Sequence, residues 1–227
     1  MPANHLPAVY IILRRTVARL SIRLSSENLD LAHFEDQSHT EIRAVRMLKI
    51  AALAVRAFLL LFGAVVLGLS VTLAKQQVVG APPSETSFGS FCGAFGILVS
   101  LVGLAGLFID KIPATVVLGA DGLASALYLA GGIALTIALR PVSSCTSWDA
   151  WPRYERATNK LLTGGCQDVA GDLVCPGIGT ENDVMSRCQR VQADYVFEYL
   201  AFVFGIAIVG LSFALRKRGG GSSATYV

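Results

Sequence analysis

The residues of this chain that could do chemistry are cysteines and a few charged side chains close to long apolar stretches. Four of the five cysteines fall within residues 140–195, and these are Cys145, Cys166, Cys175 and Cys188. The fifth, Cys92, stands inside an apolar stretch, where we expect it to be buried and free. Their spacing contains no Cys-x-x-Cys pair, which is the ligand arrangement typical of a zinc site. An even set of cysteines without such a pair favours two disulfides over a metal site, and leaves their connectivity open.

Three ionisable side chains touch the apolar stretches and are the candidate polar sites there. Asp121 lies between Ala120 and Gly122, and Arg56 stands at the beginning of the first apolar stretch, at a comparable depth. Opposite charges at one depth in hydrocarbon allow an ion pair between Arg56 and Asp121. Glu198 lies near the start of the last stretch, beside Asp194, where we expect water to reach it.

These charged residues argue against catalysis and transport. An intramembrane aspartyl protease needs two opposed aspartates, whereas Asp121 has no second aspartate within the apolar stretches. A proton or ion pathway needs several polar groups along one face, and Ser125 and Thr136 are the main others in the same stretch. We therefore predict no catalytic, cofactor-binding or metal-binding residues, and a structural or interfacial role for Asp121.

Four apolar stretches must position these side chains, at residues 57–74, 88–109, 117–139 and 197–215. Each is close to the roughly 20 residues that a helix needs to cross roughly 30 Å of hydrocarbon. The composition agrees, because 53% of the 227 residues are hydrophobic and only 15% are charged. We predict an all-α fold, a four-transmembrane-helix bundle with a long disulfide-containing outer loop between helices 3 and 4.

The distribution of Lys and Arg predicts the orientation of this bundle. Basic residues crowd the region before the first stretch, and Arg216, Lys217 and Arg218 follow the last one at once. The positive-inside rule therefore places both termini in the cytoplasm, which an even number of spans permits. Residues 140–195 hold six basic residues against seven acidic ones, so this loop can lie on the opposite side. The net charge of +3 thus reflects the orientation of the chain in the membrane, and the basic residues do not indicate nucleic-acid binding.

By composition the chain has three parts. Residues 1–49 form an N-terminal cytoplasmic tail, residues 50–218 the membrane domain with its outer loop at 140–195, and residues 219–227 a flexible tail. The basic, moderately apolar start of the chain has three interpretations. It fits an amphipathic helix on anionic lipid, a mitochondrial transit peptide, or a poorly ordered or untranslated stretch before a start at Met47.

Glycines are frequent in the apolar stretches and predict close helix packing. Gly89 and Gly93 form one G-x-x-x-G sequence in the second stretch. Such spacing lets two helices approach closely, either within one molecule or between two copies. We favour packing within the molecule, because the short connections among the first three stretches make them antiparallel neighbours.

Several short motifs lie along the membrane domain. They are an Arg56-Ala-Phe-Leu-Leu-Leu-Phe opening, the aspartate early in the third stretch, Ser143-Ser-Cys145, and Arg187-Cys188 before an aromatic-rich last stretch. Together these motifs resemble those of fungal MARVEL-domain proteins, of the tetraspan type similar to non-classical export proteins. The resemblance covers roughly residues 49–218.

This resemblance implies a non-enzymatic membrane protein with both termini cytosolic. It would organise membrane microdomains, membrane apposition or vesicle trafficking, in the plasma membrane or an endomembrane. Membrane lipids are the expected partners, together with other proteins or further copies of the chain, and neither a cofactor nor nucleic acid is expected. The alternative function is a small channel or transporter, or an accessory subunit of one.

Overall fold

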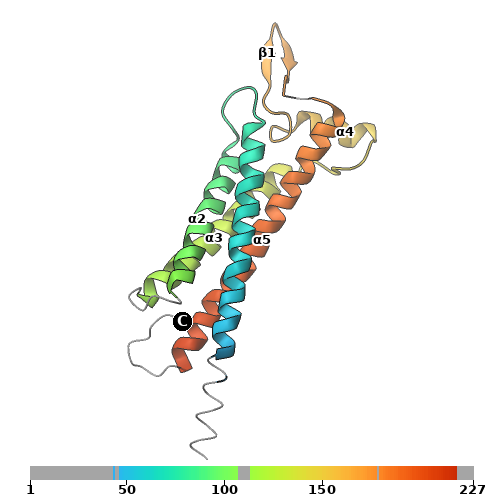
Figure 1. Ribbon diagram of the computed structural model, residues 1–227. Helices are drawn as coiled ribbons and strands as arrows, with labels where there is room; N and C mark the ends of the chain where they lie inside the picture. Colours follow the sequence, from blue (N-terminus) through green and yellow to red (C-terminus); the bar gives the residue numbers. More distant parts are fainter. Residues whose placement is uncertain (1–42, 44–45, 107–112, 178, 219–227) are drawn as a thin grey trace, which may run out of the picture. The chain divides into compact units, whose positions relative to one another are not determined.

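The computed structural model describes residues 43, 46–106, 113–177 and 179–218 (Figure 1). Most of the N-terminal tail and the tail at 219–227 lie outside the described residues, and so do the interpretations given above for them. Contacts divide the chain into two units, Met1–Leu48 and Lys49–Val227. The described residues of the first unit are helical, and the membrane domain belongs to the second.

Four helices are long and apolar enough to cross a membrane. They are the first span, Arg46–Lys75, followed by α2 (Ser84–Gly106), α3 (Ala114–Leu139) and α5 (Glu181–Arg218). The predicted all-α fold with four membrane-spanning helices is thus confirmed, and the chain is a multi-pass membrane protein. Figure 1 shows these helices running side by side, with the loop between α3 and α5 gathered at one end of the bundle.

One proline and several side-chain hydroxyl groups suit these helices to an apolar environment. Pro113 lies immediately before α3, at a position where the missing N–H of proline removes no helical hydrogen bond. Within the spans, hydroxyl groups donate back to the carbonyl four residues earlier at 2.7–2.9 Å, at Thr72, Ser90, Ser125, Thr136 and Ser212. Their hydrogens are therefore satisfied inside the same helix, as hydrocarbon requires.

The bundle core consists of two apolar clusters. One lies at the loop end and contains Leu73, Leu135, Leu139, Cys145, Leu161, Leu162, Val184, Cys188 and Val191. The other is built from Ala52, Leu59, Phe62, Val66, Cys92, Tyr128, Ala201 and Ile208. In the second cluster, Phe62 of the first span meets Phe204 of α5 edge to face, with ring centroids 5.2 Å apart.

Each long helix also exposes large apolar side chains outward. Examples are Leu61 (56% exposed), Leu98 (61%), Ile137 (64%) and Val203 (58%), one from each of the four spans. In water such surfaces would be an aggregation hazard, whereas lipid tails solvate them. The exposed belt is therefore the lipid-facing surface of the bundle.

The loop between α3 and α5 carries structure of its own and is shorter than predicted. It contains α4 (Ala150–Thr158) and an antiparallel hairpin of β1 (Gln167–Val169) and β2 (Asp172–Val174). The helix α5 already begins at Glu181, so residues 181–195 belong to a helix and not to the loop. The reason is that Val184, Cys188 and Val191 fall at helical spacing and are buried against the core, although polar residues between them conceal the pattern.

The hairpin turns through Ala170 and Gly171, whose φ angles are 59° and 93°. Two successive positive φ angles are typical of the type I′ turn that suits two-residue hairpins. The Asp168 side chain accepts a hydrogen bond from the Gly171 N–H at 2.8 Å, and the disulfide between Cys166 and Cys175 flanks the strands. The hairpin is thus fixed by local contacts.

Candidate functional site

The polar interior of the bundle is the candidate site, and it begins with Arg56 and Asp121. Arg56 Nη1 donates to Asp121 Oδ1 at 2.6 Å, and Nη2 donates to Oδ2 at 2.5 Å. Arg56 is 1% exposed and Asp121 is 3% exposed. This bidentate geometry is the strong form of a charge-assisted contact. It joins the first span to α3 with both charges neutralised in the apolar interior.

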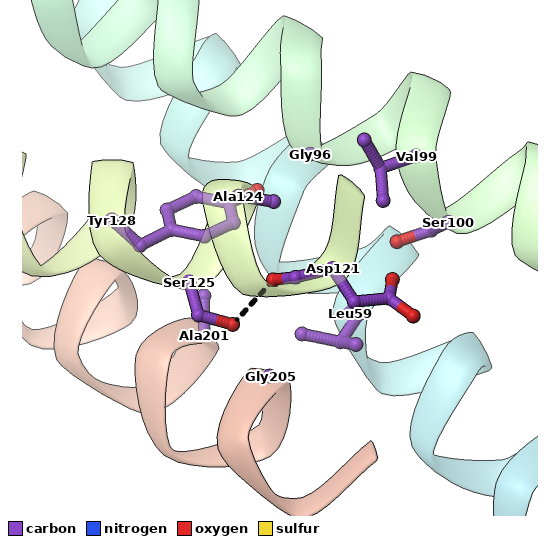
Figure 2. Close-up of a pocket in the computed structure, with 10 residues that line it drawn as sticks. All are labelled: Leu59, Gly96, Val99, Ser100, Asp121, Ala124, Ser125, Tyr128, Ala201 and Gly205. Atoms are coloured by element: carbon purple, nitrogen blue, oxygen red, sulfur yellow. Dashed lines mark hydrogen bonds between the residues drawn. The ribbon is translucent and has the colours of Figure 1, made fainter. Parts of the chain in front are cut away.

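Glycines on neighbouring helices make room for this ion pair and for Ser125 beside it. A Cβ atom at Gly103 of α2 would overlap the Arg56 guanidinium, and one at Gly205 of α5 would overlap Ser125 Oγ. Ser125 Oγ in turn donates to the Asp121 carbonyl oxygen at 2.7 Å, the interaction drawn in Figure 2. Small residues on α2 and α5 therefore set how closely these helices approach the pair.

The space left beside Asp121 is small. A cavity of about 10 Å³ lies among residues that include Ser100, Asp121, Ser125 and Tyr128, which come from α2 and α3 (Figure 2). A single water molecule needs about 10–15 Å³ measured in this way. This cavity therefore has room for about one water molecule and for no larger solute.

A second polar layer lies nearer the loop end and contains Asp194 and Glu198 of α5. Both side chains are 0% exposed. Our prediction that water reaches Glu198 is therefore wrong. The reason is that Gly89 of α2 and Gly131 of α3 carry no side chains, so these helices close over the carboxyl group.

Each of these two acids contacts a different neighbour. Ser70 Oγ of the first span donates to Asp194 Oδ2 at 2.6 Å. A Cβ atom at Gly131 would lie 2.6 Å from Glu198 Oε1 and 2.7 Å from Oε2, and one at Gly89 would overlap Ser70 Oγ. Residues from all four membrane helices thus form this layer.

Cys92 and Tyr128 belong to the core between these two layers. Cys92 is a free, buried cysteine, as the sequence predicted, and its thiol lies 3.5 Å from the Leu127 carbonyl oxygen. The Tyr128 ring enters a gap left by two glycines, since a Cβ atom at Gly96 would overlap its hydroxyl group and one at Gly63 would lie 3.0 Å away. Both groups are packed side chains without access to solvent.

Two disulfides hold the loop between α3 and α5, and they give the connectivity that the sequence left open. Cys145 pairs with Cys188, with a Cα–Cα distance of 5.4 Å, and Cys166 pairs with Cys175 at 4.0 Å. The first bond ties the segment after α3 to α5, across 43 residues of sequence. It therefore closes the loop over the end of the bundle.

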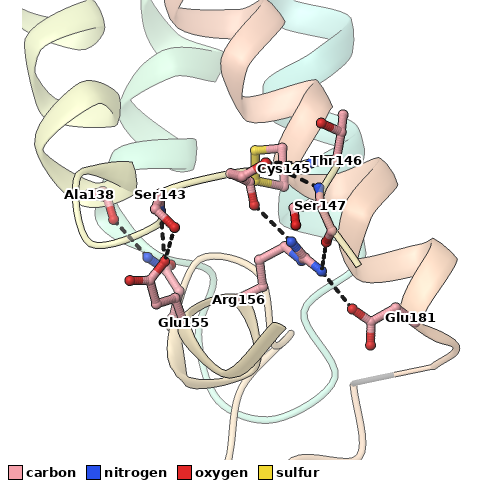
Figure 3. Close-up of a disulfide and its surroundings, with 11 residues drawn as sticks. Ala138, Ser143, Cys145, Thr146, Ser147, Glu155, Arg156 and Glu181 are labelled. Atoms are coloured by element: carbon pink, nitrogen blue, oxygen red, sulfur yellow. Dashed lines mark hydrogen bonds and ion pairs between the residues drawn. A yellow bond between two sulfur atoms is a disulfide. The ribbon is translucent and has the colours of Figure 1, made fainter. Parts of the chain in front are cut away.

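Arg156 of α4 organises the same region, and the sequence analysis missed it. It is 0% exposed, and Nη1 donates to the Ser144 carbonyl oxygen at 2.8 Å. Its Nη2 donates to the Ser147 carbonyl oxygen at 2.9 Å and to Glu181 Oε1 at 2.6 Å, all beside the Cys145 disulfide (Figure 3). Arg156 thus links α4, the segment after α3, and the start of α5.

A second contact attaches α4 to the end of α3. The Ser143 backbone N–H and hydroxyl donate to Glu155 Oε2 at 2.8 and 2.6 Å, and Asn159 Nδ2 donates to the Ala138 carbonyl oxygen at 2.9 Å. The hydrogen bonds from Ser143 stabilise the charged carboxylate and lower the pKa of Glu155 below its usual range. The loop is therefore a folded cap that rests on the bundle.

The described residues contain no group of three or more His, Cys, Asp or Glu side chains that could hold a metal ion. Both carboxylate oxygens of Asp121 are engaged by Arg56, which leaves that aspartate poorly suited to proton transfer. The geometry of the interior is that of close helix packing, with a buried ion pair between the first span and α3.

The comparisons with known proteins agree with this geometry. The family model of MARVEL, a membrane-associating domain, matches residues 49–211, a range that reaches all four spans. The chain belongs to the MARVEL family. Its members are in general non-enzymatic membrane-associated domains. Neither the comparison with curated proteins nor that with solved structures finds a match.

Proposed function

We propose that this MARVEL protein is a non-enzymatic organiser of membranes, acting in microdomain formation, membrane apposition or vesicle trafficking. The observation that carries the proposal is the family match across all four membrane helices. The geometry supports it, because the Arg56–Asp121 pair and the glycine contacts hold the helices together while large apolar side chains face the lipid. The motifs noted in the sequence further support the fungal type that is similar to non-classical export proteins.

The proposed partners are membrane lipids and further copies of the chain or other membrane proteins. Each long helix offers exposed apolar side chains, on which either lipid tails or another span could pack. We propose the plasma membrane or an endomembrane as the location, with both termini in the cytoplasm. The basic residues at the beginning of the first span, which include Arg46 and Lys49, support that orientation.

A fluorescent fusion at the C-terminus tests the location and the organising role in living cells. We expect patches in the plasma membrane or discrete vesicles, with lateral enrichment above that of a single-span anchor carrying the same fluorophore at the same level. A distribution as even as that of the anchor would contradict the proposal. A mitochondrial pattern would favour the transit-peptide interpretation of the N-terminal tail.

The orientation is tested by labelling the loop cysteines. After mild reduction of intact cells, a membrane-impermeant thiol reagent should reach Cys166 and Cys175 if the protein is in the plasma membrane, since both are partly exposed. For an endomembrane protein, the same cysteines should be protected in sealed microsomes and labelled after detergent. Labelling in sealed, right-side-out microsomes would overturn the proposed topology.

The second candidate function is a small channel or transporter, or an accessory subunit of one. The buried acids Asp194 and Glu198 favour it, because ionisable side chains inside a membrane often belong to ion or proton pathways. Purified protein in sealed liposomes tests it through dye-reported flux of protons, Na⁺, K⁺ and Cl⁻. Flux above that of empty liposomes would support this candidate over the organiser.

A further inference from the structure

The carboxyl group of Glu198 is buried in the bundle, and no basic side chain among the described residues forms an ion pair with it. Its side chain is 0% exposed, and neither Oε1 nor Oε2 has a hydrogen-bond partner in the part of the chain that the structure describes. An ionised carboxylate in this position would lose its hydration and gain nothing in return. Such a group takes up a proton instead of remaining charged.

The fit around the Glu198 carboxyl group is tight. Gly131 of α3 lies so near that a Cβ atom there would come within 2.7 Å of both carboxyl oxygens, and one at Gly89 of α2 would lie 3.4 Å from Oε1. The two glycines therefore form a gap that fits this carboxyl group and leaves little room for hydrating water.

The groups that face Glu198 from each neighbouring helix are neutral or acidic. Asp194 lies one helical turn away on α5, Cys92 comes from α2 and Tyr128 from α3. The first span contributes Ser70, whose hydroxyl donates to Asp194 Oδ2, while Asp194 Oδ1 has no hydrogen-bond partner among the described residues. A second carboxyl group so close further disfavours ionisation of both.

The nearest basic residues on these helices are engaged or face outward. Arg56 on the first span lies 14 residues before Ser70, about 21 Å along the helix axis, and it is bound to Asp121. Lys75 at the end of the same span is exposed, and Arg190 of α5 lines an open pocket with Gln76 and Asp183.

We propose that Glu198 is a proton-binding site of the bundle, occupied by one proton at neutral pH. With the proton bound, the carboxyl group is neutral and α2, α3 and α5 close around it through Gly89 and Gly131. Loss of the proton leaves a carboxylate that needs water or a cation, so the helices must loosen around it. The site therefore couples helix packing near the loop end of the bundle to proton binding, whether or not the protein organises lipid.

The direct test observes the wild-type protein in lipid nanodiscs. The chain has seven glutamates, so labelling glutamate with ¹³C at its carboxyl carbon gives a short set of resonances. We expect one resonance in the position of a protonated acid at neutral pH, and the others as carboxylates. Seven carboxylate resonances at neutral pH would overturn the proposal, with no variant required.

A variant assigns the protonated resonance to Glu198, and added salts distinguish a bound proton from a bound metal cation. In Glu198→Gln the protonated resonance should disappear, whereas Glu85→Gln, in the first turn of α2 and only partly buried, should leave it unchanged. The protonated resonance should also persist when Na⁺, K⁺ or Ca²⁺ is added. Retention of the resonance in Glu198→Gln, or its loss on addition of one of these cations, would contradict proton binding at Glu198.

Discussion

Arg56 and Asp121 are joined by two parallel hydrogen bonds although 65 residues separate them in the sequence. One residue lies on the first span and the other on α3, and both are buried. Since a charge in the apolar interior needs its partner, this pair fixes the relative register of the two helices. The sequence allowed the contact because both residues lie at a comparable depth.

Removing one partner of this ion pair should destabilise the protein strongly. Asp121→Asn or Arg56→Gln leaves one buried charge, and each should lower the free energy of unfolding by about 3–5 kcal/mol. The double variant should lose less than the sum of the two, with a coupling of about 0.5–3 kcal/mol. Unfolding in detergent measures all four proteins, and additive losses would show that the two side chains do not interact.

The glycine contacts predict a contrast between two Gly→Ala substitutions. A Cβ atom at Gly93 would lie 2.6 Å from the Leu67 backbone nitrogen, whereas one at Gly122 meets nothing within 4 Å. Gly93→Ala should therefore destabilise the bundle by about 1–3 kcal/mol, because backbone atoms must move apart. Gly122→Ala is the matched control and should be neutral or slightly stabilising. Equal effects in thermal unfolding would argue against the packing of α2 on the first span.

The two disulfides should contribute unequally to stability. Chain entropy predicts about 4 kcal/mol for Cys145–Cys188, which closes 43 residues, and about 2.6 kcal/mol for Cys166–Cys175, which closes 9. Paired Cys→Ser variants measured under non-reducing conditions test this order. Peptide masses from a non-reducing digest should show both bonds and a free Cys92, and any cross-pairing would contradict the structure.

The cap should weaken in acid through Glu155. Because hydrogen bonds from Ser143 lower the pKa of Glu155 in the folded state, its contribution is present above the unfolded pKa and is lost as pH falls through the folded one. Wild type should therefore be more stable than Glu155→Gln near neutral pH, and the difference should vanish at low pH. Asp172→Asn, in the exposed hairpin, controls for general charge loss. A constant difference at all pH values would exclude this linkage.

Hydropathy and residue counting were sufficient to predict the main architecture. The four spans follow from the lengths of the apolar stretches, and the cysteine set of the loop follows from its even number and spacing. Cys92 was recognised as buried because it stands inside an apolar stretch. These features depend on local sequence alone.

The remaining features depend on contacts that local sequence does not encode. Glu198 was expected to meet water because it lies near the end of an apolar stretch, yet Gly89 and Gly131 from two other helices enclose it. Arg156 resembled an ordinary loop charge, and its burial follows from carbonyl groups of Ser144 and Ser147 that the folded loop brings around it. The helical turn at Val184 and Cys188 was hidden by intervening polar residues.

The most direct test of the membrane-organising role is lateral self-association of the purified protein in lipid vesicles. Copies labelled with donor or acceptor at the C-terminus, at a fixed low ratio of protein to lipid, should show energy transfer above that calculated for random mixing. Dilution with unlabelled protein should reduce the transfer, since the copies compete for the same clusters. Transfer at the random level in vesicles of several lipid compositions, together with solute flux through the same vesicles, would contradict an organising function and favour a channel or transporter.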